Sequence, residues 1–266
     1  MVPDLPVLPV LAADCSSCFG LCCVLLPFRR SSAFAADKAS GEPCRHLDAA
    51  DHCGIHDSLH ERGWSGCATF DCFGAGQHVS QVTYAGTSWR EQDQLGEMAA
   101  VLSVVRQLHE MLAHLAEVTR RAPDPAATAM TEELLALTHA VPDTLLRADL
   151  EEIRSRVSPA LQEATVRLHG PARPMPADLA GADLRDRDLA RADLRGAFLV
   201  QADLRHADLA RADLLGADLR DADVRGARLA EAWFLTQSQV NATRGNVATT
   251  LPDALHRPGH WDQNPG

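Results

Sequence analysis

Basic residues outnumber acidic ones in none of the three parts of the sequence. Its formal net charge is −11, and acids exceed bases by 9 to 6 in residues 1–90, 13 to 8 in residues 91–176 and 14 to 11 in residues 177–266. Domains that bind nucleic acid carry a basic patch that meets the phosphate backbone. The charge pattern therefore predicts a protein that does not bind nucleic acid.

A hydrophobic run long enough to cross a bilayer is also missing. The uncharged run of residues 15–28 is too short, because a spanning helix needs about 20 apolar residues. The first residues are apolar, but they lack a basic start and contain Pro3, Pro6 and Pro9, which is unlike a secretory signal. We therefore expect a soluble, cytoplasmic protein without membrane contact.

Common catalytic motifs are absent from the sequence. It shows no Ser/His/Asp order, no phosphate-binding loop and no paired-carboxylate motif. The GxG within FGAGQH, at residues 73–78, follows no predicted strand and lacks the third glycine of a dinucleotide-binding fingerprint, so we interpret it as a turn. These absences favour a binding protein over an enzyme that works without a metal.

Residues 177–236 consist of twelve consecutive five-residue units, beginning ADLAG, ADLRD, RDLAR and ADLRG. A helix repeats its faces every 3.6 residues and a strand every two, so a period of five requires the chain to turn in every unit. We predict that the central residue of each unit and the Ala two before it face a core, and that the other three positions face water. The central residues are Leu179, Leu184, Leu189, Leu194, Leu199, Leu204, Leu209, Leu214, Leu219, Val224, Leu229 and Phe234.

These units resemble the pentapeptide-repeat family, whose motif is A(D/N)LXX. The resemblance implies a right-handed quadrilateral β-helix with four units per coil, so twelve units would stack as three coils to about 15 Å at the spacing of a sheet. We interpret Trp233 and Phe234 as the start of a cap over an open end. The sequence that follows, FLTQSQVNATRG and later RPGHW, resembles the ending of actinobacterial pentapeptide-repeat proteins.

Some pentapeptide-repeat proteins imitate DNA and bind gyrase, which requires a long rod with an acidic face. Here an Asp is commonly followed two residues later by an Arg, so the charges are expected to neutralise one another along the coils. With about three coils, DNA mimicry is the least favoured function. The expected partner is a protein or peptide, bound by the β-helix faces or by an apolar helical stripe.

All eight cysteines lie in the first 72 residues. Without a secretory signal, such a cluster indicates metal binding rather than disulfides. A Cys-x2-Cys pair is a common half-site for zinc and for iron–sulfur clusters. The side chains of the adjacent Cys22 and Cys23 point in different directions, so the two are not expected to bind one ion equally. Eight cysteines therefore allow either two metal sites or one site with spare thiols. The candidate ligands are Cys15, Cys18, Cys22, Cys23, Cys44, Cys53, Cys67 and Cys72.

His56 and His60 are additional candidate ligands. They are four residues apart and would share a face if residues 55–63 were helical. The alternative is that both are ordinary surface histidines.

The order of the cysteines, with CSSCFGLCC followed by CRHL, CGIHD, GC and FDCF, resembles the bacterial cysteine-cluster proteins described as zinc- or iron-chelating domains. The resemblance covers about residues 14–80 and implies zinc, iron or an iron–sulfur cluster as the cofactor. A domain of this kind occurs in a flagellin lysine methylase. By analogy, the alternative function is an enzyme that modifies a peptide or a small molecule. The sequence assigns no catalytic residue.

Apolar residues recur at steps of three and four across residues 90–121, which predicts a long amphipathic helix. We expect it to stop at the prolines of residues 122–125, and shorter helices to follow at residues 131–140, 142–156 and 158–169. The apolar stripe consists of Leu95, Met98, Ala99, Leu102, Val105, Leu108, Met111, Leu112, Leu115 and Val118.

The sequence thus predicts a multidomain α+β protein. Its parts are a cysteine-rich metal-binding domain (1–90), a helical domain (91–170), a linker (171–176), a pentapeptide-repeat β-helix (177–246) and a C-terminal cap or tail (247–266). The favoured function is a non-enzymatic metal-binding protein whose repeat scaffold recognises a partner. The alternative is a metal- or iron–sulfur-dependent enzyme.

Overall fold

The computed structural model describes residues 8–121 and 123–263. The chain divides into two compact units, which we call the N-terminal unit (residues 1–65 and 71–165) and the C-terminal unit (residues 66–70 and 166–266). Each unit is considered by itself. Within the described residues, no helix is both long enough and apolar enough to cross a membrane.

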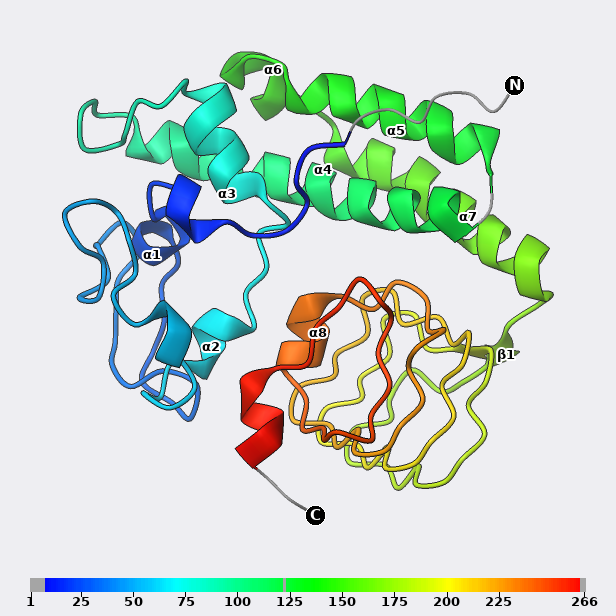
Figure 1. Ribbon diagram of the computed structural model, residues 1–266. Helices are drawn as coiled ribbons and strands as arrows, with labels where there is room; N and C mark the ends of the chain where they lie inside the picture. The colour runs from blue at the N-terminus through cyan, green and yellow to red at the C-terminus, as the bar shows by residue number, and fades with distance from the viewer. Residues whose placement is uncertain (1–7, 122, 264–266) are drawn as a thin grey trace. The chain divides into compact units, whose positions relative to one another are not determined.

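The long helix α4 (Leu95–Arg121) is the centre of the N-terminal unit. Its apolar stripe is buried as predicted, from Met98 to Val118, and it packs against α5 (Pro125–Thr138) and α6 (Pro142–Leu146). The helix begins at Leu95 rather than Arg90. In Figure 1 these helices lie side by side with α7 (Leu150–His169), most of which belongs to the same unit.

The prolines act differently from the prediction. Pro125 does not merely stop α4: it is the first residue of α5, where the Asp124 carboxylate accepts hydrogen bonds from the backbone N–H groups of Ala126 and Ala127 at 3.0 and 3.2 Å. The helix expected from residue 131 therefore starts six residues earlier.

The break expected near residue 157 is absent, because α7 continues through the exposed Pro159. Pro159 has no N–H to donate to the carbonyl of Ser155. Because Ser155 is exposed, water can donate to this carbonyl instead. The break lies instead between α6 and α7, where the Asp149 carboxylate accepts from the N–H of Glu152 at 2.9 Å.

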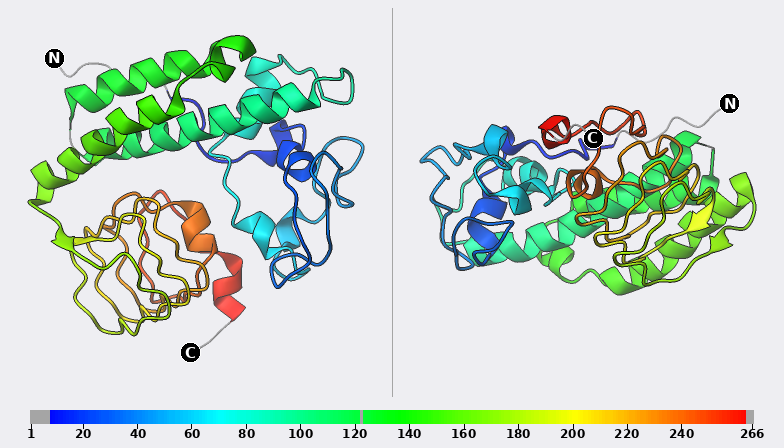
Figure 2. Two further views of the ribbon diagram at one scale, coloured as in Figure 1. Left: turned by 180° about the vertical axis from the view of Figure 1, so that it is seen from behind. Right: turned by 90° about the horizontal axis from the view of Figure 1, so that it is seen from below.

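Parallel bridges in the C-terminal unit join residues twenty apart along the repeat, such as Asp183 with Asp203 and Asp203 with Asp223. Each coil therefore takes four five-residue units, and Figure 2 shows the coils stacked on one another. The pairing extends beyond the predicted repeat. It begins with strand β1 (Arg173–Pro174), which lies in the segment predicted as linker and pairs with β2 (Ala192–Asp193) of the repeat. The pairing ends at Thr250.

The core of the coils consists of the predicted residues. The central Leu or Val and the Ala two before it are buried from Leu184 to Leu229, except that Ala182 is only partly buried. Because residues twenty apart stack, each coil adds one Leu or Val side chain to each of four columns and buries apolar surface against its neighbours. Leu179, in the first unit, is only partly buried because its neighbour on one side is not another repeat.

A left-handed residue closes ten of the twelve units. The fifth residue has a positive φ in each unit from Gly181 (65°) to Gly226 (71°), and the N–H of the following Ala donates to the carbonyl of the central residue, as in Ala207 to Leu204 at 3.1 Å. A positive φ at the third position of such a turn is typical of type II turns. Six of these ten positions are not glycine, and they include Gln201 and His206.

The Asp of the motif stabilises the same turn. In nine units its carboxylate accepts a hydrogen bond from the backbone N–H two residues later, for example Asp208 from Ala210 at 3.0 Å. Where that residue is Arg, the guanidinium usually pairs with the same carboxylate, as in Arg205 with Asp203 at 2.7 Å. The Arg185 guanidinium lowers the pKa of Asp183 to about 2. The predicted charge neutralisation along the coils is thus observed.

The prediction that three positions of every unit face water is wrong at four sites, one of which is Leu235 in the last unit. Asp213 and Asp223 are buried, the first beside Arg195, whose Nε lies 2.7 Å from its carboxylate. Trp233 is fully buried against Phe234. This burial agrees with the interpretation of both aromatic residues as the beginning of a cap.

The rest of the cap is a short helix and the tail. Helix α8 (Gln237–Asn241) starts with a capping box made by Thr236 and Gln239. The Gln239 amide also donates to the carbonyls of Leu214 and Ala217, both at 2.9 Å, and Trp261 of the tail is buried in the core of the unit. Carbonyls that a further coil would have paired are therefore satisfied.

Replacing Leu204 with Ala should destabilise the C-terminal unit by about 2 to 5 kcal/mol, because the side chain is fully buried and its removal leaves a cavity between coils. Hydrogen exchange of backbone amides in residues 177–250, measured by mass spectrometry, should become correspondingly faster. The matched control is Phe198→Ala, which removes a larger side chain that is 56% exposed and should change stability by less than about 0.5 kcal/mol. Equal effects of the two variants would contradict the assigned core.

Candidate metal centre

The cysteine-rich segment contains only short helices. They are η1 (Cys15–Ser17), α1 (Leu21–Leu25), η2 (His56–Ser58), α2 (Ser65–Ala68) and α3 (Ala75–His78). Backbone contacts between loops bring distant cysteines together. The N–H of Cys44 donates to the carbonyl of Cys23 at 2.9 Å, and Cys53 pairs with Leu47 in an antiparallel bridge.

Gly20, just before α1, allows the chain to pass close to this loop. Its φ is +63°, and a Cβ added there would lie 2.5 Å from the Leu47 side chain. A larger residue at this position would strain the backbone and push the Leu47 loop away. The glycine therefore helps to bring Cys53 close to the cysteines of α1.

Three thiols meet beside α3. The Sγ atoms of Cys18 and Cys72 lie 2.9 and 3.7 Å from the point where a Cβ on Gly76 would be, so only glycine fits between them. Burial, together with the neighbouring Cys18 and Cys72 and the more weakly acting Cys23 and Cys53, raises the pKa of Cys15 to about 12. Cys15, Cys18 and Cys72 therefore form one group.

Further thiols gather around α1. Cys23 hydrogen-bonds with Cys22 and with Cys53, and Cys53 also interacts with Cys44. The hydrogen bond from Cys22 lowers the pKa of Cys23, while that bond and burial raise the pKa of Cys22. Cys22 also interacts with Cys18 and Cys15 of the first group. We call the resulting set the thiol cluster; its members are Cys15, Cys18, Cys22, Cys23, Cys44, Cys53 and Cys72.

The eight cysteines, which all lie within the described residues, form no disulfide with one another. Burial is the main cause of the raised pKa of Cys18, Cys53 and Cys72. No group of three or more His, Cys, Asp or Glu side chains within residues 8–121 and 123–263 has the arrangement that could hold a metal ion. The thiols are thus neighbours, but their sulfurs do not converge on one point, and metal ligation by the cysteines stays a prediction.

The other candidate ligands are Cys67, His56 and His60. Cys67 is on α2 in a short segment that belongs to the C-terminal unit. His56 is largely exposed, with Nδ1 3.5 Å from the Asp57 carboxylate, and its helix η2 ends at Ser58, before His60. The continuous helix that would have placed His56 and His60 on one face is therefore not observed.

Lys38 is a member of this region that the sequence analysis missed. It is 9% exposed, and its Nζ donates to the carbonyls of Val24 at 2.7 Å, Ala39 at 3.0 Å and Glu42 at 2.9 Å. Electrostatic interactions connect it to Cys44 and Cys23. The signal was present in the composition, because Lys38 is the one lysine in a sequence whose other basic residues are arginine.

A histidine group lies beside α3. The ring of His78 is 5.0 Å from that of His109 on α4 and 5.2 Å from that of His139 after α5. His78 Nε2 contacts the carbonyl of Thr138 at 2.9 Å, and His109 Nδ1 contacts the carbonyl of Phe73 at 2.8 Å. Burial lowers the pKa of His78, and burial with the nearby His78 and His139 lowers the pKa of His109 to about 4.

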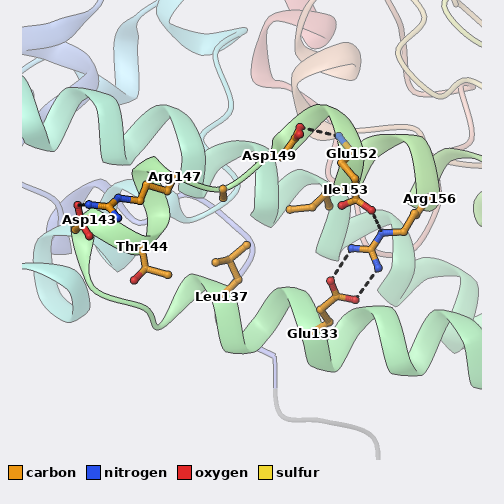
Figure 3. A pocket seen from close by; sticks show the side chains of 10 residues that line it. Glu133, Leu137, Asp143, Thr144, Arg147, Asp149, Glu152, Ile153 and Arg156 are labelled. Carbon is orange, nitrogen blue, oxygen red and sulfur yellow. Dashed lines mark hydrogen bonds and ion pairs between the residues drawn. The ribbon is translucent and has the colours of Figure 1, made fainter.

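A hollow of about 420 Å³ lies among α5, α6 and α7 (Figure 3). Its charged side chains pair with one another: Arg156 with Glu133 at 2.6 Å and with Glu152 at 2.9 Å, and Arg147 with Asp143 at 2.8 Å. Such mutual pairing holds the helices together and offers no reactive group. We therefore assign no chemistry to this hollow.

Comparison with known proteins agrees with the coil architecture. The family of pentapeptide repeats matches residues 188–226 in eight copies, so this part of the chain consists of pentapeptide repeats. It is 49% identical over 264 residues to the uncharacterized protein YybG of Bacillus subtilis (strain 168), with 94% of this chain and 95% of YybG covered. At this identity and coverage, the chain belongs to the same family as YybG.

Two solved structures are similar to part of the chain. A pentapeptide repeat protein from the Arabidopsis thaliana thylakoid lumen is 31% identical, with 32% of this chain and 61% of its own covered, at a TM-score of 0.18. HetL, a pentapeptide repeat protein involved in heterocyst differentiation regulation from Nostoc sp. strain PCC 7120, is 25% identical, with 29% and 44% covered, at a TM-score of 0.15. This chain spans less than two thirds of either protein, and the likeness carries no functional argument.

The buried histidines should make the N-terminal unit sensitive to acid. Because folding lowers the pKa of His78 and of His109 (to about 4), protonation favours the unfolded chain. Their contribution to stability is complete above the unfolded pKa of about 6.5 and should be lost progressively as the pH falls toward about 4. The urea midpoint, followed by helical circular dichroism, should decrease over this interval.

His109→Asn should flatten this pH dependence, since the amide can replace Nδ1 as the partner of the Phe73 carbonyl without taking up a proton. The control is His256→Gln, which changes an exposed histidine and should leave the profile unaltered. A profile of His109→Asn identical to that of the unaltered protein would show that this histidine does not cause the acid sensitivity.

Proposed function

We propose that the N-terminal unit binds zinc or iron, the latter as an ion or an iron–sulfur cluster, through the thiol cluster. The observation that carries the proposal is that Cys18 and Cys72 lie beside Gly76 and that five further thiols of residues 15–72 interact electrostatically with these two or with one another. The repeat coil is proposed to be a scaffold that presents its faces to a protein partner. This function is non-enzymatic, and the protein acts in the cytoplasm.

The donor set fits these metals. Thiolates are soft ligands that select zinc and iron–sulfur clusters over the hard cations magnesium and calcium. Seven thiols, of which only Cys15 is exposed, would otherwise be an unusual content for a segment with so little regular structure. Ligands of a metal that folds together with its protein need not be fully assembled beforehand, since binding draws them together.

The scaffold half of the proposal is supported by the chemistry of the coil surface. Its carboxylates are largely paired with arginines of the same or the next coil, as in Arg185 with Asp183 and Arg228 with Asp208. Such a surface recognises a partner through shape and local charge rather than through a strong acidic field, which speaks against DNA mimicry. The twenty-residue register supports a right-handed coil with four sides.

The metal proposal can be tested on the full chain purified without air and without a metal-affinity tag. Elemental analysis and an absorption spectrum should show zinc without colour, or iron with a charge-transfer band, at one or more equivalents per chain. Cys72→Ser should lower the metal content by at least half, because this thiol lies within the cluster. The matched control is Ser32→Ala, an exposed position in the same segment, which should retain the metal.

Absence of both metals from the unaltered protein, and from protein refolded with either metal, would overturn the proposal. Retention of all metal by Cys72→Ser would remove that thiol from the ligand set. Turnover of a candidate substrate that disappears with the metal would instead favour the metal-dependent enzyme over the non-enzymatic protein.

A further inference from the structure

We infer that the first coil of the repeat (residues 173–192) is a dimerisation surface, on which a second copy of this chain stacks end to end. The inference concerns the open end of the coil and does not depend on metal binding. It goes beyond the proposed scaffold, whose faces lie along the sides of the coil.

The first coil has a free sheet edge. In the second coil, both backbone polar groups of Asp203 bond to the first coil, its N–H at 2.9 Å and its carbonyl at 2.8 Å. Asp178, Asp183 and Asp188 hold the same position in the first coil. Among the described residues, their N–H groups donate to no carbonyl, and of their carbonyls only that of Asp188 accepts a hydrogen bond, from Arg173 Nη1 at 3.2 Å.

The exposure of the side chains identifies the same end as open. Asp183, Asp203 and Asp223 stack in one column, and their side chains are 62%, 29% and 11% exposed. The apolar interior is also less well covered at this end, where Leu179 and Ala182 are only partly buried. The other end of the coil is covered by α8 and the tail. An uncovered edge of this kind is a template for pairing with another chain.

The last turn of α7 leads into the first coil but does not cover its edge. The ring of His169 lies 5.8 Å from that of Trp233, near the covered end of the coil. The carbonyl of His169 accepts from Arg191 Nη1 at 3.0 Å, so the end of the helix lies along the wall. Asp178 and Asp183 stay exposed.

The shape of the edge favours a second coil as the occupant over an extended peptide. Each unit offers one residue whose N–H and carbonyl both face the edge before the left-handed residue turns the chain. A straight strand would therefore pair with one unit only. A second coil turned end over end runs antiparallel to the first and meets several units at once. In an antiparallel pair, two opposed residues exchange both hydrogen bonds, which is what each Asp of the edge can do.

The even descent of the coil sets the register of the two copies. Each of the four units in a coil lies a quarter of the coil spacing below the unit before it. The gap between opposed copies is therefore even when Asp178 of each lies opposite Asp183 of the other, with the two-fold axis beside Gly181. Asp188 then meets the segment Arg173–Pro174, where the proline has no N–H and one hydrogen bond is missing. Such a contact uses the same patch on both copies and closes as a dimer.

The charges of the first coil are compatible with this contact. Residues 173–192 contain four Asp and four Arg, although the whole chain has a formal charge of −11, so two first coils repel each other little. The opposed carboxylates of Asp178 and Asp183 need a cation between them. Arg185 can supply it, because its guanidinium lies 2.6 Å from Asp183 and 3.5 Å from Asp203 and thus already joins carboxylates that stack one coil apart.

Sedimentation equilibrium of the full chain tests the dimer. With increasing concentration the mass should rise from that of one chain to that of two. A chelator of zinc and iron should not change this result, because the contact consists of backbone groups and charged side chains.

Substitutions beside the two-fold axis test the surface. Ala180 is exposed next to Gly181, so Ala180→Lys brings two like charges together and should weaken the dimer about tenfold or more, whereas Ala180→Ser should retain it. The matched control is Val247→Lys, which adds the same charge at a 76% exposed position of the covered end and should leave the dimer intact. Circular dichroism should show that all three variants are folded.

Hydrogen exchange resolved to single amides tests whether the edge itself is the contact. The amides of Asp178 and Asp183 should exchange freely in the monomer and about tenfold or more slowly in the dimer. The amide of Asp203, which is bonded within the coil, should be equally protected in both. In Ala180→Lys the two edge amides should remain fast at concentrations at which the unaltered chain is dimeric.

Several outcomes would overturn the inference. They are a chain that stays monomeric at millimolar concentration, a dimer whose edge amides are unprotected, a dimer that the chelator dissociates, and a dimer that Val247→Lys weakens as much as Ala180→Lys does. The metal content of the N-terminal unit is measured separately, so this inference and the proposed metal binding can fail independently.

Discussion

The C-terminal unit depends on one constraint, which is the left-handed conformation of every fifth residue from Gly181 to Gly226. The positive φ at this position turns the chain, and the hydrogen bond from the next Ala to the central Leu closes the turn. Only then can residues twenty apart pair and the Leu side chains stack in columns. Since non-glycine residues adopt this conformation at a cost of about 1 kcal/mol or more, the turns must be held by other interactions.

Those interactions are supplied by the Asp of the motif and by the neighbouring coils. The carboxylate of Asp203, for example, accepts from the N–H of Arg205, and the guanidinium of Arg205 returns to the same carboxylate. Backbone pairing with the coils on either side fixes the same residues again. A repeat that looks monotonous in sequence is therefore stabilised locally by the turn and globally by stacking, and its last coil is closed by Gln239 and Trp261.

The N-terminal unit follows a different principle. Its cysteine-rich loops have little regular structure, and they are held by single backbone contacts, by the buried Lys38 and by packing of α3 near α4. The histidines of α3, α4 and the end of α5 pack together where α3 lies near α4, next to the segment that carries Cys72. Acid stability and the geometry of the thiols are therefore expected to depend on the same few elements.

The sequence alone determined the features that arise from local periodicity. The five-residue period fixed the coil, its buried Leu and Ala and the pairing of Asp with Arg, and the apolar steps fixed the stripe of α4. It also indicated which residues could bind a metal, because closely spaced cysteines are typical of metal-binding segments.

Only the tertiary structure decided the features that depend on contacts between distant residues. Pro159 lies inside a helix because its missing hydrogen bond falls on the solvent side, and Trp233 is buried because the cap covers it. Seven of the eight cysteines meet, while Cys67 belongs to the other unit, and Lys38 enters the core beside them. The spacing of residues along the chain does not predict these contacts, because they depend on how the loops pack in the folded protein.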